Sequence, residues 1–160
     1  MFTKKRNKLG KTIDTLKAGE KISVEKKIED RDLLLYLGFT DDANPVYIQH
    51  DYASRTPFEK PIVPNIMING YLSSAVSMSL PGPGSVIKKV SLSYPKPLYH
   101  YGTLNLELEI TEVRNKEHLV LIKATGKDDL GDLVLEGELE VCPPYPWKPM
   151  TYDAGTFENF

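Results

Sequence analysis

The last third of the chain alternates between apolar and polar positions with a period of two. In the run 103–113, the side chains alternate between polar and apolar from Thr103 to Ile110. The apolar set is Leu104, Leu106, Leu108 and Ile110. Such alternation predicts a strand with one face in the core. Runs at 85–94, 118–127 and 133–141 are separated by turn signals, and together they predict an antiparallel meander.

Residues 61–87 follow a different pattern, because they contain no charged side chain. Between Pro64 and the Pro-Gly-Pro-Gly turn at 81–84, small and apolar residues predict a helix over 65–80. This helix is too short to cross about 30 Å of hydrocarbon, so we expect no membrane span. A helix that is apolar nearly all round belongs inside a protein. We therefore predict a central helix with the sheet wrapped around it.

The first part of the chain predicts shorter elements. We expect a strand over 19–28 and a short helix over 29–37, whose first turn is acidic, as the helix dipole favours. A polar loop over 40–47 has an Asn-Pro turn at its centre, and a second short helix is expected over 48–55. A strand, a long buried helix and an antiparallel meander, in this order, are typical of the α+β hot-dog fold.

The length of 160 residues suits one domain. We place it at 15–143, between a basic N-terminal extension at 1–14 and a proline- and aromatic-rich C-terminal tail at 144–160. No apolar segment follows the basic residues, so the extension is not a secretory signal. We expect a solvated terminus, with a weak anion-binding arm as the alternative. The tail is expected to pack across its own subunit or a neighbour, and partner recruitment is the alternative.

Charge and cysteine content exclude several classes of function. A formal net charge of −2 indicates no binding to nucleic acid. The single cysteine, Cys142, excludes a disulfide framework and a cysteine-based zinc site, and it suits a reducing compartment such as the cytoplasm. His50, His100 and His118 do not have metal-ligand spacing. We expect neither a metal nor a cofactor.

Unusual residues gather in the loop before the central helix and at the ends of that helix. The ordered segments are Asp42-Ala43-Asn44-Pro45, Pro61-Ile62-Val63, Leu80-Pro81-Gly82-Pro83-Gly84 and Pro97-Leu98-Tyr99-His100-Tyr101-Gly102. In order and spacing they resemble the MaoC-like (R)-specific enoyl-CoA hydratases and 3-hydroxyacyl dehydratases, which have the hot-dog fold. The resemblance extends over residues 16–143.

The resemblance implies a hydro-lyase that acts on 2-enoyl or 3-hydroxyacyl thioesters of CoA or acyl carrier protein. Asp42 matches the family's acid/base carboxylate, here the general base. Ser73 matches a serine that hydrogen-bonds this carboxylate, and Asn65 matches the position whose backbone N–H binds the thioester oxygen. Asn44 is expected to lie with Asn65 and Ser73 in the substrate-binding part of the site.

The sequence departs from the family pattern at Tyr47, where the family has the histidine that shares the proton transfers. The pair at 64–65 is Pro-Asn in place of His-Gly, which still supplies a backbone N–H. A tyrosine ordinarily titrates near 10, so at neutral pH it donates a proton but is a poor base. Loss of one general acid or base typically costs about 10²–10⁴ in rate. His50 is an alternative proton carrier, and an exposed histidine at a helix start is the simpler interpretation.

These observations leave several functions open. The first is a hydro-lyase with Asp42 and Tyr47 as its catalytic residues. The second is a non-catalytic subunit that binds acyl thioesters beside an active hot-dog dehydratase. In both, Asp42 has the alternative role of supporting the Asn-Pro turn. A ligand-sensing regulator is a third interpretation, although no helix-turn-helix is evident. We expect a homodimer, with a second hot-dog subunit as an alternative partner.

Overall fold

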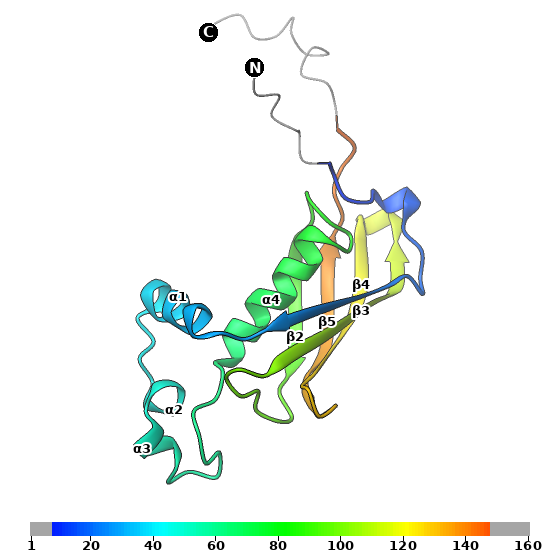
Figure 1. Ribbon diagram of the computed structural model, residues 1–160. Helices are drawn as coiled ribbons and strands as arrows, with labels where there is room; N and C mark the ends of the chain where they lie inside the picture. Colours follow the sequence, from blue (N-terminus) through cyan, green and yellow to red (C-terminus); the bar gives the residue numbers. More distant parts are fainter. Residues whose placement is uncertain (1–7, 148–160) are drawn as a thin grey trace, which may run out of the picture.

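The structure is a computed structural model that describes residues 8–147. Its five strands form one antiparallel sheet in the order β1-β3-β4-β5-β2. The sheet curves around helix α4 (Figure 1). The strands are β1 (Lys21–Lys27), β2 (Val86–Ser93), β3 (Thr103–Arg114), β4 (Leu119–Lys127) and β5 (Leu133–Cys142). The predicted α+β arrangement of an antiparallel sheet around a central helix is confirmed.

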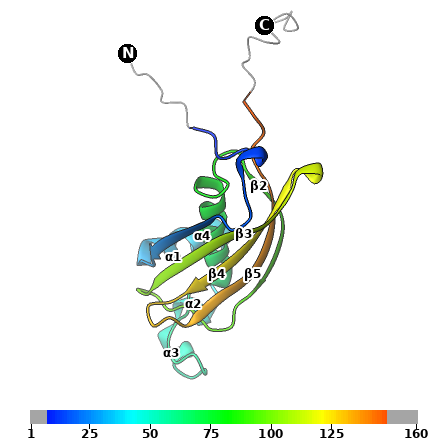
Figure 2. The same cartoon turned by 90° about the vertical axis from the view of Figure 1, so that its right-hand side faces the viewer.

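Four α-helices precede β2 in the chain. They are α1 (Asp30–Thr40), α2 (Pro45–Ile48), α3 (His50–Ala53) and α4 (Asn65–Met78), and the two 3-10 turns are η1 (Ile13–Thr15) and η2 (Asn115–Glu117). Figures 1 and 2 both show α4 against the sheet and α1, α2 and α3 gathered at one end of it. No helix among residues 8–147 is long and apolar enough to cross a membrane.

The core lies between α4 and the concave face of the sheet. The alternating apolar positions of β3 are all buried, and they pack with the inward side of α4 and with β4 and β5. The core residues of these elements include Leu104, Leu106, Leu108, Ile110, Ile68, Leu72, Val76, Ile122 and Leu139. Ile66 and Met78 on α4 are exposed by more than 60% of their surface. Within the described chain, α4 is therefore covered on one side only.

The strands pair as a meander from β3 to β5, and the outer strands complete the sheet. β1 pairs with β3, which brings Ile22 opposite Leu108, and β2 pairs with β5, which brings Val90 opposite Leu139. The sequence pattern predicted the meander but not the position of the strand over 85–94, which returns to the far edge. β1 and β2 are thus the two edges of the sheet.

Two local differences from the predicted elements occur near the polar loop. Helix α1 continues to Thr40 instead of ending near 37, because Asp41 adopts a left-handed conformation (φ 56°) and donates its N–H to Leu37 at 2.9 Å. The loop also contains α2. Asn44 caps this helix by accepting the N–H of Val46 at 3.1 Å, and Pro45 occupies the first helical position.

Both ends of the described chain contact other parts of the fold, the N-terminal one at the turn that follows α4. The N–H groups of Gly10 and Lys11 donate to the carbonyls of Pro83 and Pro81 at 2.9 and 2.8 Å. A Cβ on Gly10 would collide with the Pro81 carbonyl, so this close approach requires glycine. On the C-terminal side, Tyr145 stacks on His118 with ring centroids 3.9 Å apart. The predictions for residues 1–7 and 148–160 lie outside the described residues.

Candidate functional site

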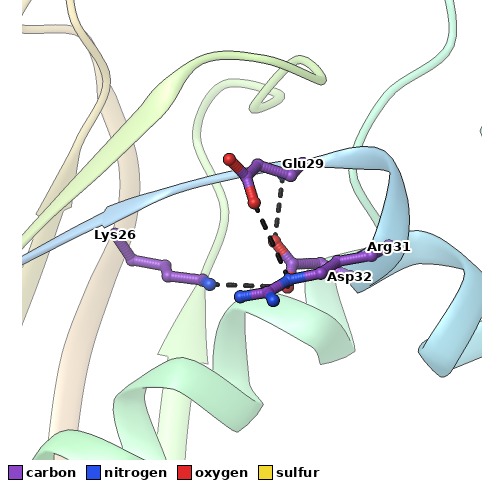
Figure 3. A network of polar contacts seen from close by, with 4 residues as sticks. All are labelled: Lys26, Glu29, Arg31 and Asp32. Carbon is purple, nitrogen blue, oxygen red and sulfur yellow. Dashed lines mark hydrogen bonds and ion pairs between the residues drawn. The ribbon is translucent and has the colours of Figure 1, made fainter.

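A polar network fixes the start of α1 (Figure 3). The Asp32 carboxylate accepts the backbone N–H of Glu29 at 3.0 Å and lies 3.4 Å from the Lys26 ammonium on β1. Arg31 lies 3.7 Å from the Glu29 carboxylate. Asp32 also raises the pKa of Tyr71 on α4 to about 12, although burial of the phenol is the larger cause. These contacts connect α1 with both the sheet and the central helix.

The end of α1 positions Asp42. The left-handed turn at Asp41 reverses the chain, and the Asp42 N–H lies 3.3 Å from Thr40 Oγ1. The Asp42 side chain then reaches back along the helix, where the Tyr36 phenol donates to its Oδ2 at 2.8 Å. Tyr36 is not among the residues predicted from the sequence. No signal in the sequence marks it, because the contact depends on the left-handed residue between helix and loop.

Tyr47 lies within electrostatic range of this pair. Its side chain is half-buried on α2. Burial, and then the negative charge of Asp42, raise the pKa of Tyr47. The pKa of Tyr36 is also raised, first by burial and then by its hydrogen bond to Asp42. Both phenols therefore stay protonated at neutral pH, and the one on Tyr36 is hydrogen-bonded to the carboxylate.

An open groove of about 650 Å³ runs between α1 and α4. Its walls are mostly apolar, and its polar members come from both helices. The residues on it are Asp32, Leu35, Tyr36, Phe39, Thr40, Ile66, Met67, Asn69, Gly70, Tyr71 and Ser73. Tyr36 thus contacts the groove with one part of its side chain and Asp42 with its hydroxyl. We call this feature the α1–α4 groove.

The first turn of α4 presents backbone N–H groups beside this groove. Pro64 precedes the helix, and its carbonyl accepts the N–H groups of Met67 and Ile68 at 3.0 and 3.3 Å. Within residues 8–147, the N–H groups of Asn65 and Ile66 donate no hydrogen bond. Such groups bind negative charge at a helix N-terminus. The role of the Asn65 N–H in binding a thioester oxygen stays a prediction.

Ser73 lies on the α1–α4 groove and Asn44 lies at the start of α2. Ser73 lines the α1–α4 groove, but among the described residues no hydrogen bond joins it to Asp42, whose carboxylate partner is Tyr36. The side-chain oxygen of Asn44 caps α2. The structure therefore brings Asp42 into contact with Tyr36, and the Asp42 charge also raises the pKa of Tyr47, after burial. Asn44 caps the helix that carries Tyr47.

The three histidines line a second cavity or contact backbone carbonyls. His50 and His100 line a second cavity, of about 450 Å³, together with Tyr47. His100 Nε2 lies 3.2 Å from the Ile62 carbonyl, its Nδ1 is buried without a partner, and burial lowers its pKa. His118 Nε2 lies 2.9 Å from the Pro143 carbonyl. Within residues 8–147, no cluster of histidine, cysteine or acidic residues has an arrangement that could hold a metal ion.

Comparison with known proteins finds relatives over most of the chain. The (R)-specific enoyl-CoA hydratase of Rhodospirillum rubrum is 29% identical over 131 residues, which are 82% of this chain and 90% of that protein. The 3-hydroxybutyryl-CoA dehydratase of Methylorubrum extorquens is 27% identical over 134 residues, or 82% of this chain and 83% of the other. No protein-family model matches the chain.

Solved structures agree with these relatives. The unliganded R-hydratase of Pseudomonas aeruginosa has a TM-score of 0.78 and 27% identity, covering 88% of this chain and 96% of that one. This likeness confirms the hot-dog fold predicted from the sequence. Sequence relatives and structural neighbours also agree with the resemblance found in the loop and at the ends of the central helix. The sequence relatives and the similar solved structures therefore support a MaoC-like hot-dog hydratase family for this chain.

Proposed function

We propose that this protein is a hydro-lyase that interconverts 2-enoyl and 3-hydroxyacyl thioesters. The observation that carries the proposal is the Asp42 carboxylate, which accepts a hydrogen bond from the protonated Tyr36 phenol next to an apolar groove and a helix N-terminus. The relatives named as enoyl-CoA hydratase and hydroxybutyryl-CoA dehydratase support the same reaction class. The substrate carrier is CoA or acyl carrier protein.

In the hydration direction, Asp42 acts as the general base. It takes a proton from water as the water oxygen bonds to the β carbon, and the electrons of the double bond move toward the thioester. The Asn65 N–H binds the thioester oxygen, which gains negative charge. Tyr47 then gives its phenolic proton to the α carbon, and proton exchange with solvent restores Asp42 and Tyr47. The reaction needs no cofactor.

The raised pKa of Tyr47 makes this donor weaker than an imidazolium. A proton donor works best when its pKa lies near the working pH, so a phenol that titrates above 10 slows the protonation step. We therefore expect a slow enzyme compared with relatives that use histidine. The same feature supports a second candidate, a non-catalytic subunit that binds acyl thioesters beside an active hot-dog dehydratase.

The α1–α4 groove is the proposed site for the acyl chain. Leu35, Phe39 and Ile66 present exposed apolar surface there, and burial of such surface by a hydrocarbon chain is favourable. The open edge at β2 and the uncovered side of α4 support a homodimer, in which a second copy completes the acyl tunnel. Light scattering on the purified protein tests this assembly: the homodimer predicts twice the mass of one chain. A lone chain, or a stable complex with a different hot-dog subunit, contradicts it.

The proposed reaction is tested by hydration of crotonyl-CoA and of longer 2-enoyl-CoA substrates. We expect turnover by the wild-type protein, and its loss by about 10²–10⁴ in Asp42→Ala. Asp51→Ala is the matched control, because Asp51 is an exposed carboxylate on α3 outside the groove. Absence of turnover for every chain length, combined with tight binding of a saturated acyl-CoA, favours the non-catalytic subunit.

A further inference from the structure

The hydrogen bond between Tyr36 and Asp42 joins the last turn of α1 to the polar loop. We propose that Tyr36 is a positioning residue for the reaction, whose phenol holds the Asp42 carboxylate in orientation beside the α1–α4 groove. This inference rests on the proposed function, and it assigns a role to a residue that the family resemblance does not include.

The Asp42 side chain has few other restraints. Within residues 8–147, Tyr36 is the partner of its only side-chain hydrogen bond, and no cation forms a salt bridge with it. The backbone on its N-terminal side is fixed by the left-handed Asp41 and by the contact with Thr40. The phenol is therefore the group that restricts rotation of the carboxylate.

The geometry of this contact leaves the carboxylate able to react. Tyr36 occupies Oδ2, so Oδ1 has no hydrogen-bond donor among the described residues. A neutral phenol donates without cancelling the negative charge, whereas an arginine or lysine would pair with it. Holding one oxygen while leaving the other open is the arrangement that a general base needs to receive a proton from a positioned water.

Tyr36 also lies on the groove itself, with Ser73 opposite on α4. Its ring therefore contributes to the wall of the acyl site while its hydroxyl sets the position of the base. A second phenol–carboxylate bond lies outside the α1–α4 groove. Tyr101 donates to Asp30 at 2.5 Å, and both residues line the second cavity. Because this phenol forms its bond with Asp30 and not with Asp42, the pair is a control for the loss of a phenol–carboxylate bond that does not hold the proposed base.

Steady-state kinetics of Tyr36→Phe and Tyr101→Phe tests the positioning role. Tyr36→Phe keeps the ring and removes only the hydroxyl. We expect kcat for 2-enoyl-CoA hydration to fall about tenfold while KM changes less than about twofold, because the acyl wall is kept and the base is no longer held. Tyr101→Phe is expected to leave both constants unchanged. An unchanged kcat in Tyr36→Phe, or an equal loss in Tyr101→Phe, overturns the inference.

A titration of the tyrosine ring carbons tests the same contact without any turnover. With ¹³C-labelled tyrosine, the Tyr36 signal should titrate at lower pH in Asp42→Asn than in the wild type. The reason is that the Asp42 charge and hydrogen bond contribute to the raised pKa of Tyr36, after burial. Asp30→Asn should shift Tyr101 and leave Tyr36 unchanged.

The two experiments separate this inference from the proposed function. A Tyr36 titration that does not respond to Asp42→Asn overturns the positioning role even if the wild type turns over substrate. A wild-type protein without hydratase activity overturns the proposed function, and with it the catalytic part of the inference, even if the Tyr36 signal responds. Support requires both a Tyr36 response and a selective fall in kcat.

Discussion

The sheet with α4 and the segment that carries α1, α2 and α3 are held in place by different kinds of contact. In the sheet, strands pair along their lengths and a continuous set of side chains is fully buried. In the second region, none of the residues of α1 and α2 is buried in the described chain, and Ala53 is the buried residue of α3. A few side-chain contacts position this region, among them those of Asp32, Tyr36 and Asn44.

This difference indicates in which part of the fold the proposed catalytic groups lie. A fully buried core tolerates little change, because each side chain there is surrounded by others. The proposed catalytic groups stand on the less buried region, where polar side chains stay accessible to water and to a ligand. The rigid part supplies the Asn65 N–H and one wall of the groove, and the other part supplies Asp42 and Tyr47.

The largest expected effect comes from restoring the family histidine with Tyr47→His. An imidazole in place of the phenol is expected to raise the hydration rate by about 10²–10⁴. It should also introduce an inflection near pH 6.5 in the rate profile, whereas the wild type should lose activity at alkaline pH only above 10, since the pKa of Tyr47 is raised. Stopped-flow or steady-state rates across pH measure both. A rate that does not rise contradicts the assigned proton donor.

The next prediction compares the change in unfolding free energy for a Leu→Ala substitution in each of the two regions. Leu108→Ala removes a side chain with 0% exposure on β3 and should lower the free energy of unfolding by about 2–5 kcal/mol. Leu35→Ala removes a side chain that is 70% exposed on α1 and should change it by less than about 0.5 kcal/mol. Urea unfolding measures both free energies. An equal loss of unfolding free energy in the two variants would contradict this difference between α1 and the sheet.

Leu35→Ala has a second consequence. Because Leu35 lines the α1–α4 groove, the variant should raise KM for long-chain 2-enoyl-CoA more than for crotonyl-CoA. Leu130→Ala, at an exposed turn, is the control. If KM is unchanged for every chain length, the acyl chain does not occupy this groove.

A smaller effect is expected where α1 is attached. Asp32→Ala removes the acceptor for the Glu29 N–H and the partner of Lys26 (Figure 3). We expect a loss of about 1 kcal/mol in unfolding free energy, typical of a lost helix cap. Asp51→Ala, which removes an exposed carboxylate on α3 outside this network, should cost less. Hydrogen exchange of α1 measures whether the loss is local to that helix.

The smallest expected effect is on the stability of the protein at alkaline pH, and it arises at Tyr71, where α4 meets α1. Tyr71 on α4 has a pKa of about 12, raised above the ordinary value of 10. The folded state therefore holds this proton more tightly than the unfolded chain, so stability present below pH 10 is lost as pH rises from 10 through 12. Tyr71→Phe should lose less stability over that range. Thermal melts at matched pH detect this difference, and identical alkaline losses would contradict it.

Much of the fold was predictable because its pattern is local. Alternation at Leu104, Leu106, Leu108 and Ile110 sets one face of β3, and the prolines at 64 and 81 bound the central helix. The position of β2 beside β5 was not predictable, because pairing between distant strands leaves no local pattern. The exposed side of α4 was also not predicted. An apolar helix is expected to be buried, but its sequence does not tell whether its own chain or a second molecule covers it.

Part of the candidate site was likewise predicted from the sequence, and part was not. Asp42 and Tyr47 are predicted site residues, assigned from the family resemblance of the loop segments. The contact with Tyr36 was not predicted, because it depends on one left-handed residue at Asp41 that reverses the chain. The expected bond between Ser73 and Asp42 came from the resemblance alone, and the position of Ser73 on the groove wall depends on the packing of α1 against α4.

The central claim is that Asp42 serves as the base of a hydro-lyase. It is tested most directly by comparing the turnover of one 2-enoyl-CoA by the wild type, Asp42→Ala and Asp51→Ala at equal concentration of folded protein. The account predicts measurable hydration by the wild type and Asp51→Ala, and a loss of about 10²–10⁴ in Asp42→Ala. Equal turnover by wild type and Asp42→Ala would contradict it.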